Sequence, residues 1–183
     1  MIRKFLACLI ATFSWQAYAA LNVGDKAPDF TAKATLAGKE FTYVLHEALK
    51  SGPVVLYFYP AAFTPGCTVE AHDFAAAVDK YKALGASVIG VSHDPIDTLK
   101  RFSVSECRSK FAVLADADGS IMHAYDAVMF LAPQHASRTS YVIAPNGRIL
   151  YVYSSLNPDK HVANTLAALR GWTTARKARP PHD

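Results

Sequence analysis

The chain has 183 residues and a formal net charge of +4 at pH 7. This length suits one domain with a sizeable core. Two basic residues fall in the first twenty positions, and residues 173–183 carry a net charge of +2, so residues 21–172 have no net charge. A neutral body offers no basic field for a polyanion, which argues against nucleic-acid binding.

The first twenty residues differ in character from the rest. They combine a basic pair at positions 3 and 4, a short apolar run over 5–13 and an Ala-Tyr-Ala sequence at 17–19. This order is typical of a secretory signal peptide, and the run is too short for a membrane span. We therefore expect cleavage after residue 19 or 20, and a mature protein that is exported to the periplasm or secreted and stays off the membrane.

The first half of the mature chain predicts a hairpin, a central strand and a long helix. Pro28 keeps the lead-in over 21–30 extended, and Gly38 marks the turn of a small hairpin over 34–43. The remaining expected elements are a short helix at 46–50, a buried strand at 53–59 and a helix at 67–84.

The second half alternates strands and helices before a late hairpin. Expected strands lie at 87–92, 111–115, 139–144 and 148–153, and expected helices at 94–107, 120–125 and 159–170. Asp94 is a natural cap for the first of these helices, with Pro95 at its first position. The order predicts one α/β domain over 21–172, with a mixed sheet flanked by helices. The Pro-rich, charged segment 173–183 is expected to be disordered.

One strand–loop–helix segment carries the chemistry. Pro60 ends the buried strand, Thr64-Pro65-Gly66 forces a tight turn, and Cys67 follows at the start of the next helix. A thiol there lies beside unpaired backbone N–H groups and the positive end of the helix dipole, which favour its thiolate form. The alternative is a small buried hydrophobe with no reactivity.

The spacing Pro60-x-x-x-Thr64-x-x-Cys67 resembles the active-site signature of the peroxiredoxins. The longer sequence FYPxxFTPGCTxE, residues 58–70, is most similar to their Q-type branch, also called the bacterioferritin-comigratory type. The resemblance continues to about residue 170. It implies a thioredoxin-like fold and a thiol-dependent peroxidase that reduces hydrogen peroxide and small organic hydroperoxides.

Within this resemblance, Cys67 is the nucleophile, and Thr64 and the N–H groups around Gly66 bind the peroxide. Arg138, in the sequence SRTSYVI, resembles the family arginine that lies over the sulfur. A guanidinium there would stabilise the thiolate. Glu70 is implied as the residue that holds this arginine. The ordinary alternatives are a solvated loop arginine and a first-turn acid favoured by the helix dipole.

Many Q-type members carry a resolving cysteine five residues after the first, but here that position is His72, for which a surface histidine is the expected role. The other cysteine of the mature chain, Cys107, is the implied resolving thiol. Arg108 and Lys110 nearby would favour its thiolate. Two alternatives stay open: a structural disulfide between the two cysteines, and an external thiol that does the resolving.

A second function is an exported thioredoxin-like thiol–disulfide oxidoreductase. That chemistry requires Cys-x-x-Cys, and Thr64 occupies the first of these positions. A third is a binding module that has the fold without the activity. No metal or organic cofactor is implied, and His93-Asp94 does not make a metal site. The reductant is expected to be a thioredoxin-like protein or a small thiol, and the state a monomer or weak homodimer. The apolar residues 129–133 could wall the pocket or contact a subunit.

Overall fold

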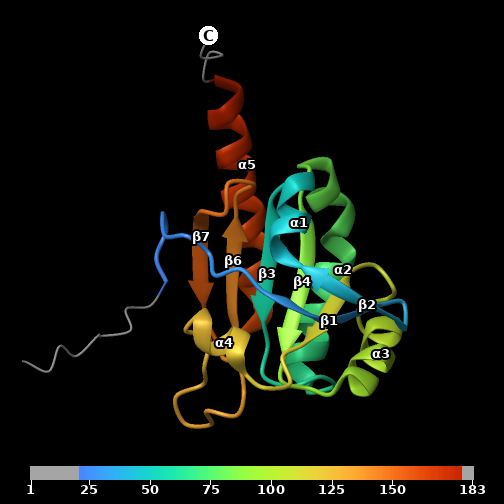
Figure 1. The fold of residues 1–183 in the computed structure, drawn as a ribbon. Helices are drawn as coiled ribbons and strands as arrows, with labels where there is room; N and C mark the ends of the chain where they lie inside the picture. Colours follow the sequence, from blue (N-terminus) through green and yellow to red (C-terminus); the bar gives the residue numbers. More distant parts are fainter. Residues whose placement is uncertain (1–20, 179–183) are drawn as a thin grey trace, which may run out of the picture.

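The computed structural model describes residues 21–178, which form one sheet covered by helices on both faces (Figure 1). The strands are β1 (Thr31–Leu36), β2 (Lys39–Val44), β3 (Val54–Phe58), β4 (Ser87–Ser92), β5 (Ala112–Ala115), β6 (Thr139–Ile143) and β7 (Ile149–Ser154). The helices are α1 (Leu45–Ser51), α2 (Pro65–Ala83), α3 (Ile96–Ser105), α4 (Ser120–Ala124), the 3-10 turn η1 (Pro158–Lys160) and α5 (His161–Ala178). The expected signal peptide lies outside the described residues.

The sheet has the strand order β2-β1-β5-β4-β3-β6-β7. β4 pairs in parallel with both β3 and β5, whereas the other pairs are antiparallel. Both edges are hairpins, β1–β2 and β6–β7, which the turn residues had indicated. The predicted mixed α/β sheet with an N-terminal hairpin is confirmed.

β3 is an interior strand between β4 and β6, and it is buried along its whole length because helices cover both faces of the sheet. Val55 and Tyr57 pack into the core layer that contains residues of α2, α3 and α5. Val54, Leu56 and Phe58 point to the other layer, with α1 and α4. The chain leaves β3 between these layers, at the carboxyl end of the strand, and α2 begins after a short loop there.

The start of α3 differs from the expectation. Its N-cap is Pro95, and no side chain caps the helix. The Asp94 carboxylate instead accepts hydrogen bonds from the Ala62 backbone N–H (2.8 Å) and from Ser92 Oγ (2.8 Å). Asp94 therefore ties the end of β4 to the loop that follows β3, which is the loop that leads to Cys67.

The closing helix is longer than predicted. α5 continues to Ala178, so the expectation of disorder from Thr173 onward is wrong for residues 173–178. Ala, Arg and Lys after Trp172 are good helix formers, and Arg176 lies one turn on, with its guanidinium 4.7 Å from the Trp172 ring centre. Residues 179–183 lie outside the described part of the chain. Within residues 21–178, no helix is long and apolar enough to span a bilayer.

Candidate active site

The loop between β3 and α2 places Cys67 in the first turn of a 19-residue helix. Thr64 is the N-cap, and its backbone oxygen accepts the N–H of Thr68 at 2.9 Å. Phe63 has a left-handed backbone (φ 65°), which turns the chain sharply before the helix. Cys67 is buried, with 2 % of its surface exposed, so only a small molecule can reach its sulfur in this arrangement.

Arg138 lies just before β6, the antiparallel neighbour of β3. Thr139, the first residue of β6, pairs with Phe58, so Arg138 lies where β3 ends. Its guanidinium is anchored at three points: Nη2 donates to Cys67 Sγ (3.3 Å), Nε to the Leu156 carbonyl (2.9 Å), and Nη1 to Glu70 Oε2. A side chain held at three points presents a fixed positive charge and fixed donors at the sulfur. The structure thus brings Arg138 and Cys67 together, as expected.

Gly66 makes this approach possible. A Cβ at residue 66 would lie 3.1 Å from Arg138 Nη2, closer than ordinary van der Waals contact. The φ angle of Gly66 is not in the left-handed region, so its role is space and not backbone freedom.

Glu70 lies one helical turn after Cys67 and is fully buried. One carboxylate oxygen binds Arg138, and burial raises the pKa of Glu70 to about 8, although the Arg138 charge acts in the opposite direction. The other oxygen, Oε1, lies 3.6 Å from Nδ1 of His161 at the start of α5. His161 was not identified from the sequence. A histidine in the first turn of a helix has no pattern that distinguishes it, and only tertiary packing brings it to Glu70.

Thr64 and Pro60 belong to the same loop as Cys67 and lie before it in the chain. Thr64 is exposed, and its hydroxyl donates to the Ala61 carbonyl at 2.9 Å, so its oxygen can still accept a hydrogen bond. The Pro60 carbonyl accepts a hydrogen bond from His135 Nδ1 at 3.3 Å. His135 belongs to the loop between α4 and β6, so this loop lies beside the Cys67 loop.

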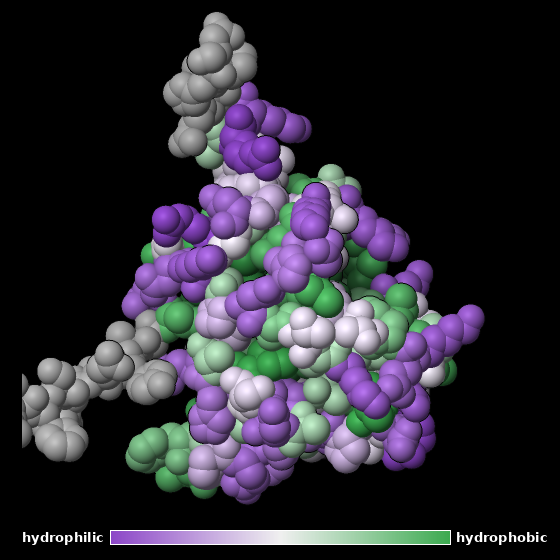
Figure 2. Space-filling view, viewed as in Figure 1, coloured by the Kyte–Doolittle hydropathy of each residue, from purple (hydrophilic) through white to green (hydrophobic). Residues whose placement is uncertain are grey.

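The loop between α4 and β6 forms the apolar projection at the lower left of Figure 2. Phe130 and Leu131 are 94 % and 88 % exposed. They point into solvent, so these two side chains do not wall the space above Cys67.

Cys107 follows α3 and is completely buried in the same core layer as Cys67. Both residues are free thiols, so a structural disulfide between them is not formed. Burial raises the pKa of Cys107, and the Glu106 charge adds to this, so the expectation that Arg108 and Lys110 favour its thiolate is wrong for the folded arrangement. The next two residues, Arg108 and Ser109, both have left-handed backbones (φ 50° and 55°).

His72 contacts the same segment. Its Nε2 lies 2.9 Å from Glu106 Oε2, and the histidine side chain is 37 % exposed. It is the partly exposed helix histidine that the sequence indicated, with an added role as a link between α2 and the residue before Cys107.

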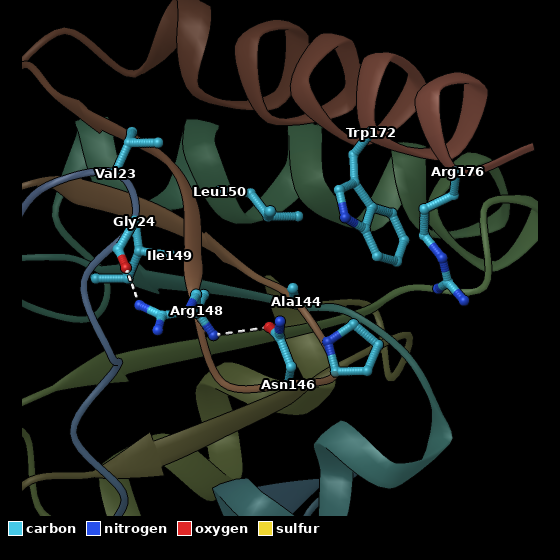
Figure 3. Close-up of a pocket in the computed structure, with 10 residues that line it drawn as sticks. Val23, Gly24, Ala144, Asn146, Arg148, Ile149, Leu150, Trp172 and Arg176 are labelled. Atoms are coloured by element: carbon cyan, nitrogen blue, oxygen red, sulfur yellow. Dashed lines mark hydrogen bonds between the residues drawn. The ribbon is translucent and has the colours of Figure 1, made fainter. Parts of the chain in front are cut away.

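A hollow of about 510 Å³ lies at the opposite end of β6, where α5 passes the turn that follows this strand (Figure 3). Trp172 and Arg176 line it from α5, and Arg148 lines it from the hairpin with its guanidinium donating to the Gly24 carbonyl. Arg138 precedes β6 and this hollow follows it, so the two sites are separated by the length of the strand. No group of three or more His, Cys, Asp or Glu residues within 21–178 is arranged to hold a metal ion.

A family model described as the AhpC/TSA family matches residues 23–152. The chain belongs to the AhpC/TSA family. Among curated proteins, the chloroplastic peroxiredoxin Q of Arabidopsis thaliana is 36 % identical over 154 residues, covering 84 % of this chain and 69 % of the relative. That of Oryza sativa subsp. japonica is 34 % identical over 151 residues, covering 82 % and 67 %.

Solved structures agree with this assignment. Peroxidoxin BcpB of Mycobacterium tuberculosis has a TM-score of 0.75 and 33 % identity, covering 82 % of this chain and 97 % of that one. A cysteine-to-serine mutant of PrxQ from Xylella fastidiosa has a TM-score of 0.75 at 22 % identity, covering 84 % and 98 %, a likeness that supports the fold alone. This AhpC/TSA protein is therefore a peroxiredoxin with a thioredoxin-like fold, an enzyme that reduces hydroperoxides at the expense of a thiol. A thiol–disulfide oxidoreductase is not favoured.

Proposed function

We propose that Cys67 is the thiolate that attacks the hydroperoxide, with Arg138, Thr64, Gly66 and Pro60 forming the site around it. The single observation that carries this assignment is the 3.3 Å contact between Arg138 Nη2 and Cys67 Sγ. The guanidinium favours the thiolate and offers donors to the peroxide oxygens as negative charge develops on them.

The first step forms one bond and breaks one. Cys67 Sγ attacks one oxygen of the peroxide, the O–O bond breaks, and the departing oxygen takes a proton to leave as water or an alcohol. Sulfur is oxidised from thiolate to sulfenic acid, and the peroxide is reduced. Thr64 accepts the peroxide O–H through the oxygen that its bond to Ala61 leaves available, which holds the substrate in line.

In the second step Cys107 attacks the Cys67 sulfenic acid, forming a disulfide and releasing water. This step requires the end of α3 to unwind, because Cys107 is fully buried and its thiol is held neutral. The two consecutive left-handed residues after Cys107 support such an opening, since each costs about 1–2 kcal/mol in the folded state. Reduction of the disulfide by an external dithiol then completes the cycle.

Hydrogen peroxide and small organic hydroperoxides fit the proposal best, because Cys67 is only 2 % exposed. We assign the reductant to a thioredoxin-like protein or a small thiol, which must reach the disulfide after the segments open. The basic, apolar and Ala-Tyr-Ala pattern of residues 1–20 supports cleavage and export to the periplasm, and the family match begins only at residue 23. The exposed apolar loop with Phe130 and Leu131 is compatible with a weak homodimer as well as a monomer.

The experiment is the addition of one equivalent of hydrogen peroxide to the reduced mature protein, followed by intact mass and a non-reducing peptide map. We expect the loss of two hydrogens and a Cys67–Cys107 cross-link, and no change in the Cys67→Ser variant. A gain of one oxygen on Cys67 without a cross-link would contradict the resolving role of Cys107 and leave the peroxidase assignment intact. Thiols that persist unchanged for minutes would refute the peroxidase assignment.

A further inference from the structure

Glu70 has one carboxylate oxygen without a hydrogen-bond donor. Oε2 binds Arg138, whereas Oε1 is buried and makes no hydrogen bond to any residue within 21–178. A lone carboxylate oxygen away from water is costly unless it carries a proton or gains a donor. His161 Nδ1 lies 3.6 Å from Oε1.

The hydrogen bonds of His161 identify its tautomer. Nε2 lies 3.0 Å from the Ser155 carbonyl, which can only accept, so Nε2 carries a hydrogen. Nδ1 lies 2.8 Å from Ser140 Oγ, whose hydroxyl can donate to it. In the neutral ring Nδ1 is therefore a lone pair that faces the free oxygen of Glu70. Two acceptor atoms therefore lie 3.6 Å apart in a dry site, and a proton on Oε1 of Glu70 would remove the repulsion between them while the Ser140 hydroxyl donates to Nδ1.

Few other charges face this pair. Arg138, just before β6, acts on both members, and the rings of Tyr153 of β7 and His161 are T-shaped to one another, with 4.8 Å between ring centres. Tyr57 of β3 also interacts with Glu70, but burial raises the pKa of its hydroxyl and keeps it neutral. Asp73 on α2 adds a repulsive charge to Glu70 but is exposed. The two charged residues just before His161, Asp159 and Lys160, are also exposed.

We propose that His161 is a positioning residue of the peroxidatic site, which together with Glu70 holds a single proton and so controls how much of the Arg138 charge acts on the Cys67 sulfur. With the proton present, the Glu70–His161 pair is neutral overall and the guanidinium acts on the sulfur with its full charge. Once the proton is lost, the Glu70 carboxylate neutralises Arg138, and the thiolate loses that support. This inference rests on the proposed role of Cys67.

The sign of the pH effect follows from burial. Burial lowers the pKa of His161 and raises the pKa of Glu70 to about 8, so near neutral pH the proton resides on Glu70. Raising the pH through about 8 removes it. We expect the rate of Cys67 oxidation to fall about tenfold above that point, since charges a few ångströms apart in a partly dry site interact strongly.

The test is the rate of Cys67 oxidation by hydrogen peroxide from pH 5.5 to 10, measured by rapid quench and mass, with iodoacetamide as a probe that needs no peroxidase activity. Wild type should show the alkaline fall with both reagents. Glu70→Gln, which cannot lose a proton, should show none. His161→Asn offers Glu70 a permanent N–H donor, which favours the carboxylate, so the fall should move at least one pH unit lower.

Thr165→Val is the matched control. The Thr165 hydroxyl donates to the His161 carbonyl and also bonds Tyr81, so this change weakens the same turn of α5 without touching Glu70. It should lower thermal stability and leave both pH profiles unchanged. A His161→Asn profile identical to wild type would overturn the proposal. If peroxide does not oxidise wild-type Cys67, the proposed function fails, while the iodoacetamide profile still tests the pair.

If His161→Asn does not fold, a ¹⁵N NMR titration of wild-type His161 replaces it. The Nε2–H tautomer is expected at neutral pH, with Nδ1 changing shift over the same interval as the alkaline fall. A ring that keeps constant shifts from pH 5.5 to 10 would refute a titrating proton on Glu70 beside Nδ1.

Discussion

Gly66→Ala is expected to separate activity from stability. The added Cβ would lie 3.1 Å from Arg138 Nη2, the nitrogen that contacts Cys67 Sγ. The guanidinium cannot retreat freely, because Nε and Nη1 are bonded to the Leu156 carbonyl and to Glu70. The donor must therefore move by a few tenths of an ångström at the point where it meets the sulfur.

Removing one donor of this kind costs about 100- to 1000-fold in rate, so we expect a partial displacement to lower the rate constant with hydrogen peroxide about 10- to 100-fold. That corresponds to about 1.4–2.7 kcal/mol in the activation free energy. Because alanine is favoured over glycine in a helix by about 0.5–1 kcal/mol, the crowding is largely offset, and the free energy of unfolding should change by less than about 1 kcal/mol.

The assays are stopped-flow oxidation of the reduced protein and urea unfolding. Gly171→Ala is the matched control, since it is the same exchange in α5, where a Cβ would meet nothing within 4 Å. It should stabilise the protein without changing the rate. A Gly66→Ala variant that keeps the wild-type rate constant would refute the view that residue 66 is glycine to admit the guanidinium.

Three further predictions concern the thiols and the buried carboxyl. Cys107→Ser should stop the cycle at the Cys67 sulfenic acid and let excess peroxide oxidise it to sulfinic acid, seen as two added oxygens by intact mass; a variant that still resists such oxidation would exclude Cys107 as the resolving thiol. Ser109→Gly removes about 1 kcal/mol of left-handed backbone strain, so the Cys107 segment should open less often and disulfide formation should slow about fivefold in quenched time courses. Ser109→Ala keeps the strain and should form the disulfide at the wild-type rate. Equal rates in the two variants would show that this strain does not promote opening. Because the folded pKa of Glu70 is raised to about 8, its contribution to stability is largest below about pH 4.5 and is lost as pH rises to about 8. Urea unfolding should therefore show wild type losing stability over this range relative to Glu70→Gln. Parallel stability curves for the two proteins would contradict the raised pKa of Glu70.

The Cys67 loop was predictable because its determinants are local. Pro60 ends a strand, Thr64 precedes a proline at the first helical position, and the cysteine follows within one turn, all inside eight residues. Arg138 is 71 positions away from Cys67 and was reached only through resemblance to a family. The helix cap predicted for Asp94 was wrong, because its carboxylate can accept either from the first N–H groups of α3 or from another loop. In the folded protein it accepts from the Ala62 N–H, which is 32 positions away.

The amino-acid sequence by itself determined the alternation of strands and helices, the mixed sheet with its two hairpins and the placement of a thiol at a helix start. These depend on spacing and on backbone preferences that act over a few residues. Only the tertiary structure decided that Cys107 is sealed in the core, that the free oxygen of Glu70 faces His161, and that α5 continues past Arg170. Burial and partner choice depend on how distant elements pack, and it is burial that sets the charge of a carboxyl or a thiol.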